Sequence, residues 1–579
     1  MLNNLTAQAT AAGSNTAFVA AGDLVGASAY DSAFAHDEPT IDLLSKMGLL
    51  VSSVGNHEFD MGITELLRKA TSTSCYSGSG AVIGSNTCVV DGAFPGASFQ
   101  YLAANVTYNS TGPTPGANPL PATFIKTFPG ANGAPGAKIG FIGAVLSGTP
   151  NEVSGAGIST LSFGDEAAAI NTQAAALKAQ GVNAVVVLIH QGGTTTSTIY
   201  GDTTCPGFSG AIAPIVANLN NNVDVVVSGH THTDYVCKLP NAAGKSVLVT
   251  QSGYYGQGLT SINLTFNNSG SVQSASAINT PVVNDTSTGL PTDVVPLAAN
   301  STIKNAVQEY GSLSNVQGAV PIGWIAGPLT IATPPSGCAS NCDSGVRDKG
   351  LESAAGDFMA DAFKATIPGA QIVFVNAGGV RATVSSPTNT YPYNLTYANI
   401  ATMAPFNNVL VSATMTGAQI KAALEQQWNP TIVAADFAPG NVGEILDVNK
   451  EFTYTWDASQ PYGSRIIASS MMLNGTPINL SSTYTVGMQA FIAGQIINPT
   501  AAAPDGFTAF AGSTNLQYYG IDNQALNAYL TSNTTQANPY VPVQPVAGQF
   551  RIHKVVGSTD CGYGSSWVVA GTCANADGH

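Results

Sequence analysis

The sequence predicts an α/β protein with two globular regions, and three observations support this prediction. In residues 1 to about 285, short apolar segments alternate with helical ones, which is the order of a layered α/β domain. Several apolar segments are continuous Val/Ile runs, which are typical of strands buried on both faces of a sheet. A polar, Pro-containing stretch at 280–298 then separates this region from a second globular one.

The elements of the first region follow from these patterns in chain order. The apolar runs predict strands at 16–23, 49–58, 138–146, 184–191 and 223–231. The helical patterns between them lie at 38–48, 63–70 and 165–181. A Gly/Pro/Ala-rich stretch at 92–136 predicts a loop with short strands, and a helical pattern at 303–313 follows the linker. We therefore expect a first domain at 1–285, a linker and hinge helix at 286–320, a second domain at 321–555 and a tail at 556–579.

The composition excludes several classes of protein. Charged residues make up only 9% of the 579 residues and the formal net charge is −15, which argues against binding to nucleic-acid polymers. No apolar run approaches 18 residues, so we expect no membrane span. A small anionic substrate is not excluded, because a local metal ion or arginine can dominate a site. We expect a monomer.

The eight cysteines indicate an oxidising compartment. No CxxC pair suggests a zinc site, and the spacings are local. We expect four disulfides in an extracellular or periplasmic protein, and the alternative is eight buried thiols. The cysteines that lie near one another along the chain are Cys75 and Cys88, Cys205 and Cys237, Cys338 and Cys342, and Cys561 and Cys573, and the sequence does not fix how they pair.

Candidate metal ligands stand at the ends of the predicted strands of the first domain. Four of the seven histidines belong to this set, a concentration that packing does not explain. The carboxyl ends of parallel strands meet at one edge of a sheet, so these side chains can converge. Carboxylate, amide and imidazole ligands suit Zn²⁺ or Mn²⁺, and two such ions can activate water against a phosphate. The set comprises Asp23, Asn56, His57, Asp60, His190, His230 and His232.

The motifs GDLVGAS, GNHEFDMG, the strand-terminal His190 and SGHTH together resemble the calcineurin-like metallophosphoesterases. The stretch AHDEPTIDLLSKMG before GNHEFD narrows the resemblance to the 5′-nucleotidase and UDP-sugar hydrolase family. The resemblance implies a four-layer β-sandwich with flanking helices, followed by an α/β nucleotide-binding domain, with the hinge between them. It also implies two divalent metal ions, with Asp23 as their bridging ligand.

The resemblance further implies a role for each remaining residue of the set. Asn56, His190 and His230 would bind one ion and His232 the other. His57 and Asp60 would form the catalytic pair, in which His57 stabilises the transition state or protonates the leaving oxygen.

One family motif is missing from the sequence. The Asp-x-His at the end of the first strand has no counterpart, because residues 1–22 contain neither Asp nor His. The chain also opens without a signal peptide. We expect N-terminal truncation to explain both, and the alternative is an inactive homologue.

The second domain contains the segments ESAAGDFMADAF, FVNAGGVR, APFNNVLV and APDGFTAF in the family's order. The resemblance implies that Asn376 and Arg381 contact the nucleotide and that Phe406 and Phe491 enclose the base. Asp505 would bond the ribose, and Arg347 is a further phosphate contact. The gap before Asp505 is longer than in the family.

These observations together predict an exported hydrolase of nucleoside 5′-monophosphates. The alternatives on the same scaffold are a 2′,3′-cyclic nucleotide phosphodiesterase and a UDP-sugar hydrolase. An alternative of another class is a non-catalytic nucleotide-binding homologue.

Overall fold

The chain forms two compact units in the computed structural model. The first unit comprises Met1–Gly26, Ala35–Thr149 and Gly157–Leu313, and the second comprises Ala27–Phe34, Pro150–Ala156 and Ser314–His579. The structure describes residues 1–26, 28–78, 81–130, 136–153, 155–197, 199–282, 300–332, 349–406, 408–429, 444–493, 507–543 and 550–563.

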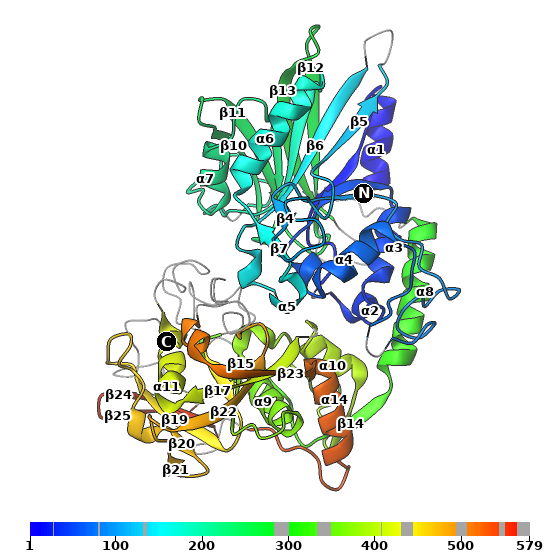
Figure 1. Ribbon diagram of the computed structural model, residues 1–579. Coiled ribbons are helices and arrows are strands. Elements are labelled where there is room, and N and C mark those ends of the chain that lie inside the picture. The colour runs from blue at the N-terminus through cyan, green and yellow to red at the C-terminus, as the bar shows by residue number, and fades with distance from the viewer. Residues whose placement is uncertain are drawn as a thin grey trace. The chain divides into compact units, whose positions relative to one another are not determined.

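A mixed six-stranded sheet forms the centre of the first unit (Figure 1). Its strands, in spatial order, are β10 (Asp234–Pro240), β11 (Ser246–Ser252), β9 (Val225–Ser228), β8 (Ala184–His190), β6 (Ala137–Val145) and β5 (Thr123–Phe128). A parallel three-stranded sheet contains β1 (Phe18–Ala21), β2 (Leu49–Ser53) and β3 (Gln100–Leu102). Two antiparallel pairs complete the unit: β12 (Gly258–Phe266) with β13 (Val272–Pro281), and β4 (Val106–Tyr108) with β7 (Leu161–Phe163).

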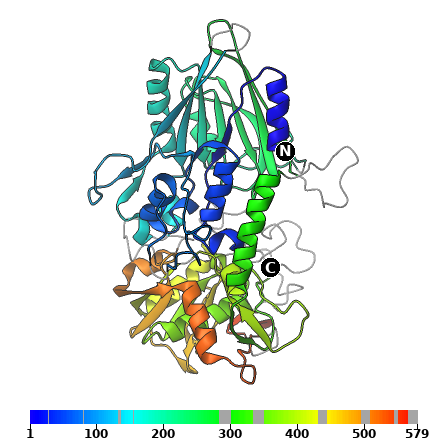
Figure 2. The same ribbon diagram turned by 90° about the vertical axis from the view of Figure 1, so that its right-hand side faces the viewer.

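The helices of the first unit cover these sheets. They are α1 (Leu2–Ala11), α3 (Glu38–Lys46), α4 (Gly62–Thr71), α6 (Glu166–Ala179) and α7 (Ile212–Ala217). Figure 2 shows α6 and α1 on opposite sides of the sheet. Two helices contain residues of both units: α5 (Gly155–Ile158) and α8 (Ser301–Gly318).

Side-chain alternation along β8 explains why this sheet is buried on both faces. Val185 and Val187 pack into the cluster that contains Ile170 of α6, whereas Val186 and Leu188 pack with residues of β1–β3 and β12–β13. Successive residues of a strand point to opposite faces, so a continuous apolar run serves both clusters. The result is a β-sandwich with helices outside it.

The second unit is built around two five-stranded sheets. The first has the order β18 (Leu446–Val448), β15 (Ile372–Asn376), β22 (Thr483–Gln489), β17 (Val409–Thr416) and β23 (Thr514–Ile521). The second has the order β21 (Thr476–Pro477), β20 (Met472–Leu473), β19 (Phe452–Asp457), β24 (Ile552–Val556) and β25 (Thr559–Tyr563). A short pair joins β14 (Pro321–Ile325) to β16 (Tyr393–Thr396).

The helices of this unit are α2 (Tyr30–Ala33), α9 (Ala354–Thr366), α10 (Tyr397–Met403), α11 (Gly417–Glu425) and α14 (Asp522–Asn533). One face of β15 packs against Phe358 and Phe363 of α9, and its other face packs Phe374 into a cluster with Trp428 and Trp456. The sheet therefore lies between two apolar cores.

The disulfides Cys75–Cys88 and Cys205–Cys237 are present. Cys561 is also disulfide-bonded. Cys338, Cys342 and Cys573 lie outside the described residues, as do most of the predicted linker and of the tail. Within the described part of the chain, no helix combines the length and apolar character needed to cross a membrane.

Candidate active site

Three strands of the first unit bring candidate ligands together. Asp23 stands two residues after β1, His190 is the last residue of β8, and His230 follows β9. The Asp23 Oδ2 and His190 Nε2 atoms are 2.9 Å apart. The imidazole rings of His190 and His230 meet edge to face, with centroids 5.2 Å apart. Residues separated by some 200 positions in the chain thus share one site.

The orientation of His190 fits a shared cation. Its Nδ1 lies 2.7 Å from the carbonyl oxygen of Ala21, which can only accept, so Nδ1 carries the proton. A neutral His190 therefore turns the lone pair of Nε2 toward the Asp23 carboxylate. Two acceptors at 2.9 Å repel each other unless a proton or a metal ion is shared between them.

The electrostatics of this pair agree with that interpretation. Burial would lower the pKa of His190, but the Asp23 carboxylate outweighs it and raises that pKa. Burial would raise the pKa of Asp23, but the imidazoles of His190 and His57 hold it well below its usual value. Burial and the neighbouring His190 lower the pKa of His230 to about 3, so its imidazole is neutral and can act as a metal ligand.

Asn56 supplies a further donor suited to a metal ion. Its side chain is 3% exposed, and its Oδ1 atom has no hydrogen-bond partner among the described residues. A buried carbonyl oxygen without a hydrogen-bond partner lowers the stability of the fold unless a ligand or an ion binds it. The donors of Asp23, Asn56, His190 and His230 therefore fit one divalent ion.

His57 and Asp60 form the expected pair on the segment after β2. The His57 Nδ1 lies 2.8 Å from Asp60 Oδ2, so the carboxylate orients the ring. The backbone N–H of His57 donates to Asp23 Oδ1 at 3.0 Å, which ties the pair to the metal-ligand candidates. Burial raises the pKa of Asp60, and the attraction of His57 reduces this shift.

Glu58 has a structural role at the site that the sequence analysis missed. Its buried carboxylate accepts from the backbone N–H groups of Asp23 at 2.8 Å, of Leu24 at 2.7 Å and of Gly55. It therefore holds the segment after β1 against the segment after β2. Its position between His57 and Asp60, as a carboxylate next to two polar site residues, was the available signal.

Glycine allows the same two segments to approach each other. A Cβ atom at Gly55 would lie 2.1 Å from Asp23 Oδ1, and one at Gly22 would lie 2.5 Å from the nitrogen of Gly55. Neither contact leaves room for a side chain.

Three of the candidate ligands have left-handed backbone. The φ angles are +51° at Asp23, +75° at His230 and +56° at His232. Such angles are uncommon outside glycine and cluster at functional sites, where the surrounding structure enforces them. Nine other non-glycine residues among the described ones have such angles too, so this backbone agrees with a site here but does not identify it.

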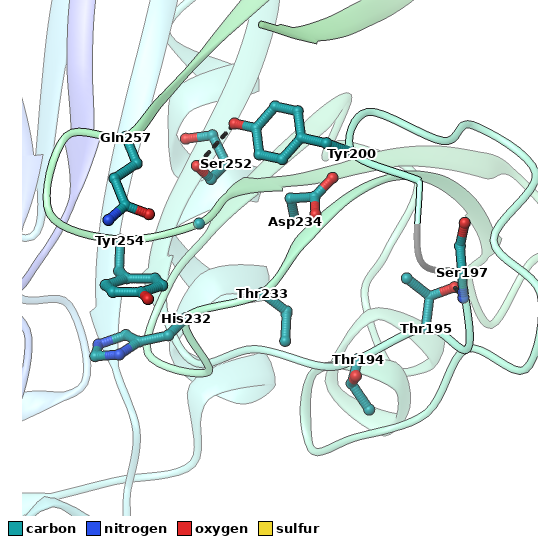
Figure 3. Close-up of a pocket in the computed structure, with 11 residues that line it drawn as sticks. Thr194, Thr195, Ser197, Tyr200, His232, Thr233, Asp234, Ser252, Tyr254 and Gln257 are labelled. Carbon is teal, nitrogen blue, oxygen red and sulfur yellow. Dashed lines mark hydrogen bonds between the residues drawn. The ribbon is translucent and has the colours of Figure 1, made fainter. Parts of the chain in front are cut away.

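His232 follows His230 by two residues, and it is one of the groups that lower the pKa of His230. Its ring stacks on Tyr254 (Figure 3), with centroids 5.0 Å apart and planes at 14°. Among the described residues, no three His, Cys, Asp or Glu side chains are arranged to hold a metal ion. This holds for Asp23, His190 and His230 as well as for His232, so the support for an ion at Asp23 comes from the residue types and from the Oδ1 of Asn56, which has no hydrogen-bond partner in the described part of the chain.

The second unit brings together two of its predicted substrate contacts. The guanidinium of Arg381 lies over the ring of Phe406, 5.4 Å from its centroid. Asn376 ends β15 and is buried, and its Nδ2 donates to Glu444 at 3.4 Å. Phe491 is partly buried against the Trp428 cluster. Arg347 and Asp505 lie outside the described residues.

Comparison with known proteins identifies the second unit. Residues 332–503 match the family described as the 5′-nucleotidase C-terminal domain. The cell wall protein Lmo0130 of Listeria monocytogenes is 28% identical over 515 residues, which cover 86% of this chain and 57% of that protein. Endonuclease YhcR of Bacillus subtilis is 24% identical over 479 residues, or 83% of this chain and 33% of that protein. The chain thus spans between a third and somewhat over half of these relatives.

A solved structure shares the fold of both units. The 5′-nucleotidase precursor of Thermus thermophilus superposes with a TM-score of 0.59 at 22% identity, over 96% of this chain and 92% of that chain. The α/β class and the two-domain arrangement predicted from the sequence are confirmed by this likeness, and the predicted family resemblance is confirmed by the match of residues 332–503.

Proposed function

We propose that this chain, which belongs to the 5′-nucleotidase family through its C-terminal domain, hydrolyses nucleoside 5′-monophosphates to nucleoside and phosphate. The observation that carries the proposal is the convergence of Asp23, His190 and His230 at one set of strand ends. The His57–Asp60 pair, hydrogen-bonded to Asp23, adds an acid–base group at the same place.

Two divalent ions are part of the proposal. Asp23, Asn56, His190 and His230 would hold one ion, and Asp23 and His232 would contribute to the other. When bound, such ions lower the pKa of a water molecule and offset the charge of the phosphoryl group. The buried, partnerless Oδ1 of Asn56 supports the first site.

The His57–Asp60 pair would handle the proton of the reaction. Asp60 accepts from Nδ1, which leaves Nε2 of His57 to donate a proton to the ribose oxygen as its bond to phosphorus breaks. The Asp60 carboxylate stabilises the charged imidazole before that transfer. The hydrogen bond from the backbone N–H of His57 to Asp23 Oδ1 holds the pair in a fixed position relative to the proposed ligands.

The second unit would bind the nucleoside. The guanidinium of Arg381 offers a planar set of donors to phosphate or ribose oxygens, and Phe406 offers a face for base stacking. We propose that Asn376, Phe491, Arg347 and Asp505 complete this site. The cell wall relative and the two disulfides support a location outside the cytoplasm.

The experiment that tests the proposal is phosphate release from AMP with added Mn²⁺ or Zn²⁺. We expect release that EDTA abolishes and that renewed metal restores. Parallel assays with 2′,3′-cyclic AMP and UDP-glucose separate the alternative substrates. Binding of AMP without release in either metal would overturn the proposal in favour of a non-catalytic homologue.

Replacing Arg381 with alanine should weaken substrate binding more than turnover. Loss of a charge-assisted hydrogen bond costs about 1.5–3 kcal/mol, so the KM for AMP should rise about 10- to 100-fold. Steady-state kinetics give the KM. Arg465→Ala is the matched control, because its guanidinium also lies over an aromatic ring, that of Trp428, outside the predicted site. An unchanged KM in Arg381→Ala would remove this residue from the substrate site.

A further inference from the structure

The turn that joins Asn376 to Arg381 in the second unit lies against a buried carboxylate, that of Glu444. Glu444 is 6% exposed, whereas Arg381 is exposed. The Oε1 atom of Glu444 accepts from the backbone N–H of Gly378 at 2.8 Å and from Nδ2 of Asn376 at 3.4 Å. An ionised carboxylate only accepts hydrogen bonds, so the nitrogen of the Asn376 amide, and not its oxygen, faces Glu444. One carboxylate therefore contacts both the start and the middle of the turn.

The turn approaches Glu444 too closely for a side chain to fit between them. A Cβ atom at Gly378 would lie 2.8 Å from Glu444 Oε1 and 3.1 Å from Asn376 Nδ2. A Cβ atom at Gly379 would lie 3.0 Å from Oε1 of Gln489, the last residue of β22. Non-bonded carbon atoms are normally about 3.5–4.0 Å apart, so glycine is needed at Gly378 for this approach. The shape of the turn is thus matched to the position of the carboxylate.

The backbone that carries Glu444 is itself fixed. The N–H of Glu444 donates to the carbonyl of Gln427 at 2.9 Å, and the buried side chain of Gln427 accepts from the N–H of Leu446 at 2.7 Å. In the antiparallel pairing of β18 with β15, Leu446 lies opposite Asn376. Because the carboxylate is held in place before any ligand arrives, it can hold the turn without a further loss of entropy on binding.

The same turn sets the position of Arg381. The backbone N–H of Arg381 donates to the carbonyl of Met403 at 2.8 Å, and its Nη1 donates to the carbonyl of Gly378 at 3.5 Å. Gly378 thus donates its N–H to Glu444 and offers its carbonyl to the guanidinium, which lies over the ring of Phe406. A shift of the turn would move the guanidinium relative to that ring. Displacement of a binding group by about 1 Å is enough to weaken its interactions strongly.

We propose that Glu444 is a positioning residue for nucleoside binding, because it holds the turn in the shape in which Asn376 and Arg381 bind the ligand. The inference rests on the proposed function, since it takes Asn376 and Arg381 as contacts of the nucleotide. Glu444 acts through Gly378 and Asn376 and has no contact of its own with the ligand. It has no part in the metal chemistry of the first unit.

A matched control separates this role from a general effect on stability. Glu425, at the end of α11 in the same unit, is 5% exposed. Its two oxygens accept from the backbone N–H groups of Arg465 and Ile466, both at 2.9 Å. Glu425→Ala therefore removes a buried carboxylate with two backbone donors, as Glu444→Ala does, but outside the Asn376–Arg381 turn. Thermal denaturation measures the stability of both variants.

The test is binding of AMP to the full chain in EDTA, which prevents turnover, measured by isothermal titration calorimetry. Glu444→Ala should raise the dissociation constant about tenfold, which corresponds to about 1.4 kcal/mol. With Mn²⁺, the KM for AMP should rise by a similar factor while kcat stays unchanged. Glu444→Gln should restore most of the affinity, because its Oε1 can still accept from the N–H of Gly378. Glu425→Ala should leave the dissociation constant unchanged.

A second variant covers the case in which Glu444→Ala does not fold. Gly378→Ala adds the Cβ atom that would lie 2.8 Å from Glu444 Oε1, so it should also weaken AMP binding. An unchanged dissociation constant in Glu444→Ala or, if that variant is unfolded, in Gly378→Ala would overturn the proposal. Equal weakening by Glu425→Ala would do the same, because the effect would then be one of general stability.

Two further outcomes separate this proposal from the proposed function. If the unchanged chain does not bind AMP, both are overturned. If it binds AMP but releases no phosphate with Mn²⁺ or Zn²⁺, the proposed hydrolysis alone fails. The dissociation constants in EDTA then still decide the role of Glu444, because they do not depend on turnover.

Discussion

Replacement of His57 by asparagine is expected to lower the kcat for AMP by about 10²- to 10⁴-fold, the usual contribution of a general acid or base. Asparagine can still accept or donate a hydrogen bond but cannot transfer a proton at neutral pH. Because His57 is not a predicted ligand, the metal content of the variant, measured by atomic emission, should stay unchanged. The KM for AMP should also change little.

His553→Asn provides the matched control. His553 also pairs with a carboxylate, Asp560, at 2.8 Å, but it belongs to β24 in the second unit. Turnover should be unchanged in this variant. If His57→Asn retained full turnover, His57 would have no acid–base role, and the proton would have to come from another group.

Replacement of Glu58 by glutamine is expected to destabilise the site and to weaken metal binding. The carboxylate accepts from Asp23, Leu24 and Gly55, whereas an amide has one acceptor oxygen and turns an NH₂ group toward the remaining N–H donors. The cost should be about 3 kcal/mol of unfolding free energy. Because Asp23 loses its support, the affinity for Mn²⁺ should fall about 10- to 100-fold, the usual effect of removing an outer-shell partner.

Urea denaturation and calorimetric titration with Mn²⁺ measure the two effects. Glu166→Gln is the control, because Glu166 is also buried and accepts from a backbone N–H, that of Ser147 at 2.6 Å, through one oxygen. That oxygen remains in glutamine. A Glu58→Gln protein with unchanged Mn²⁺ affinity would show that Glu58 does not position Asp23.

The sequence predicted much of this fold because its signals are local. The run AVVVLIH forms β8 over Ala184–His190. The pattern after Asp165 forms α6, and the side chain of Asp165 accepts a hydrogen bond from the backbone N–H of Ala168 in its first turn. The candidate metal ligands could be predicted from the same strands, because each of them stands at or just after the end of an apolar run. Their convergence could be inferred from the rule that parallel strands end at one edge.

Other features of the site are tertiary contacts, whose partners no local pattern specifies. Nothing in the order of residues shows that Glu58 reaches the backbone of Asp23, which lies 35 positions earlier. The stacking of Tyr254 on His232 likewise joins segments 22 positions apart. Side chains that bond backbone groups of distant loops are recognisable only once the loops are placed.

The left-handed backbone at Asp23, His230 and His232 restricts how this site can change during evolution or redesign. Asn, Asp, Gly and His tolerate such φ angles. For β-branched and long side chains, the same angles cost roughly 1–2 kcal/mol of conformational free energy. The residue types allowed by backbone shape are therefore largely those that also bind metals or have no side chain. An exchange at one of these proposed ligands would therefore favour asparagine, which would alter metal preference before it abolished metal binding.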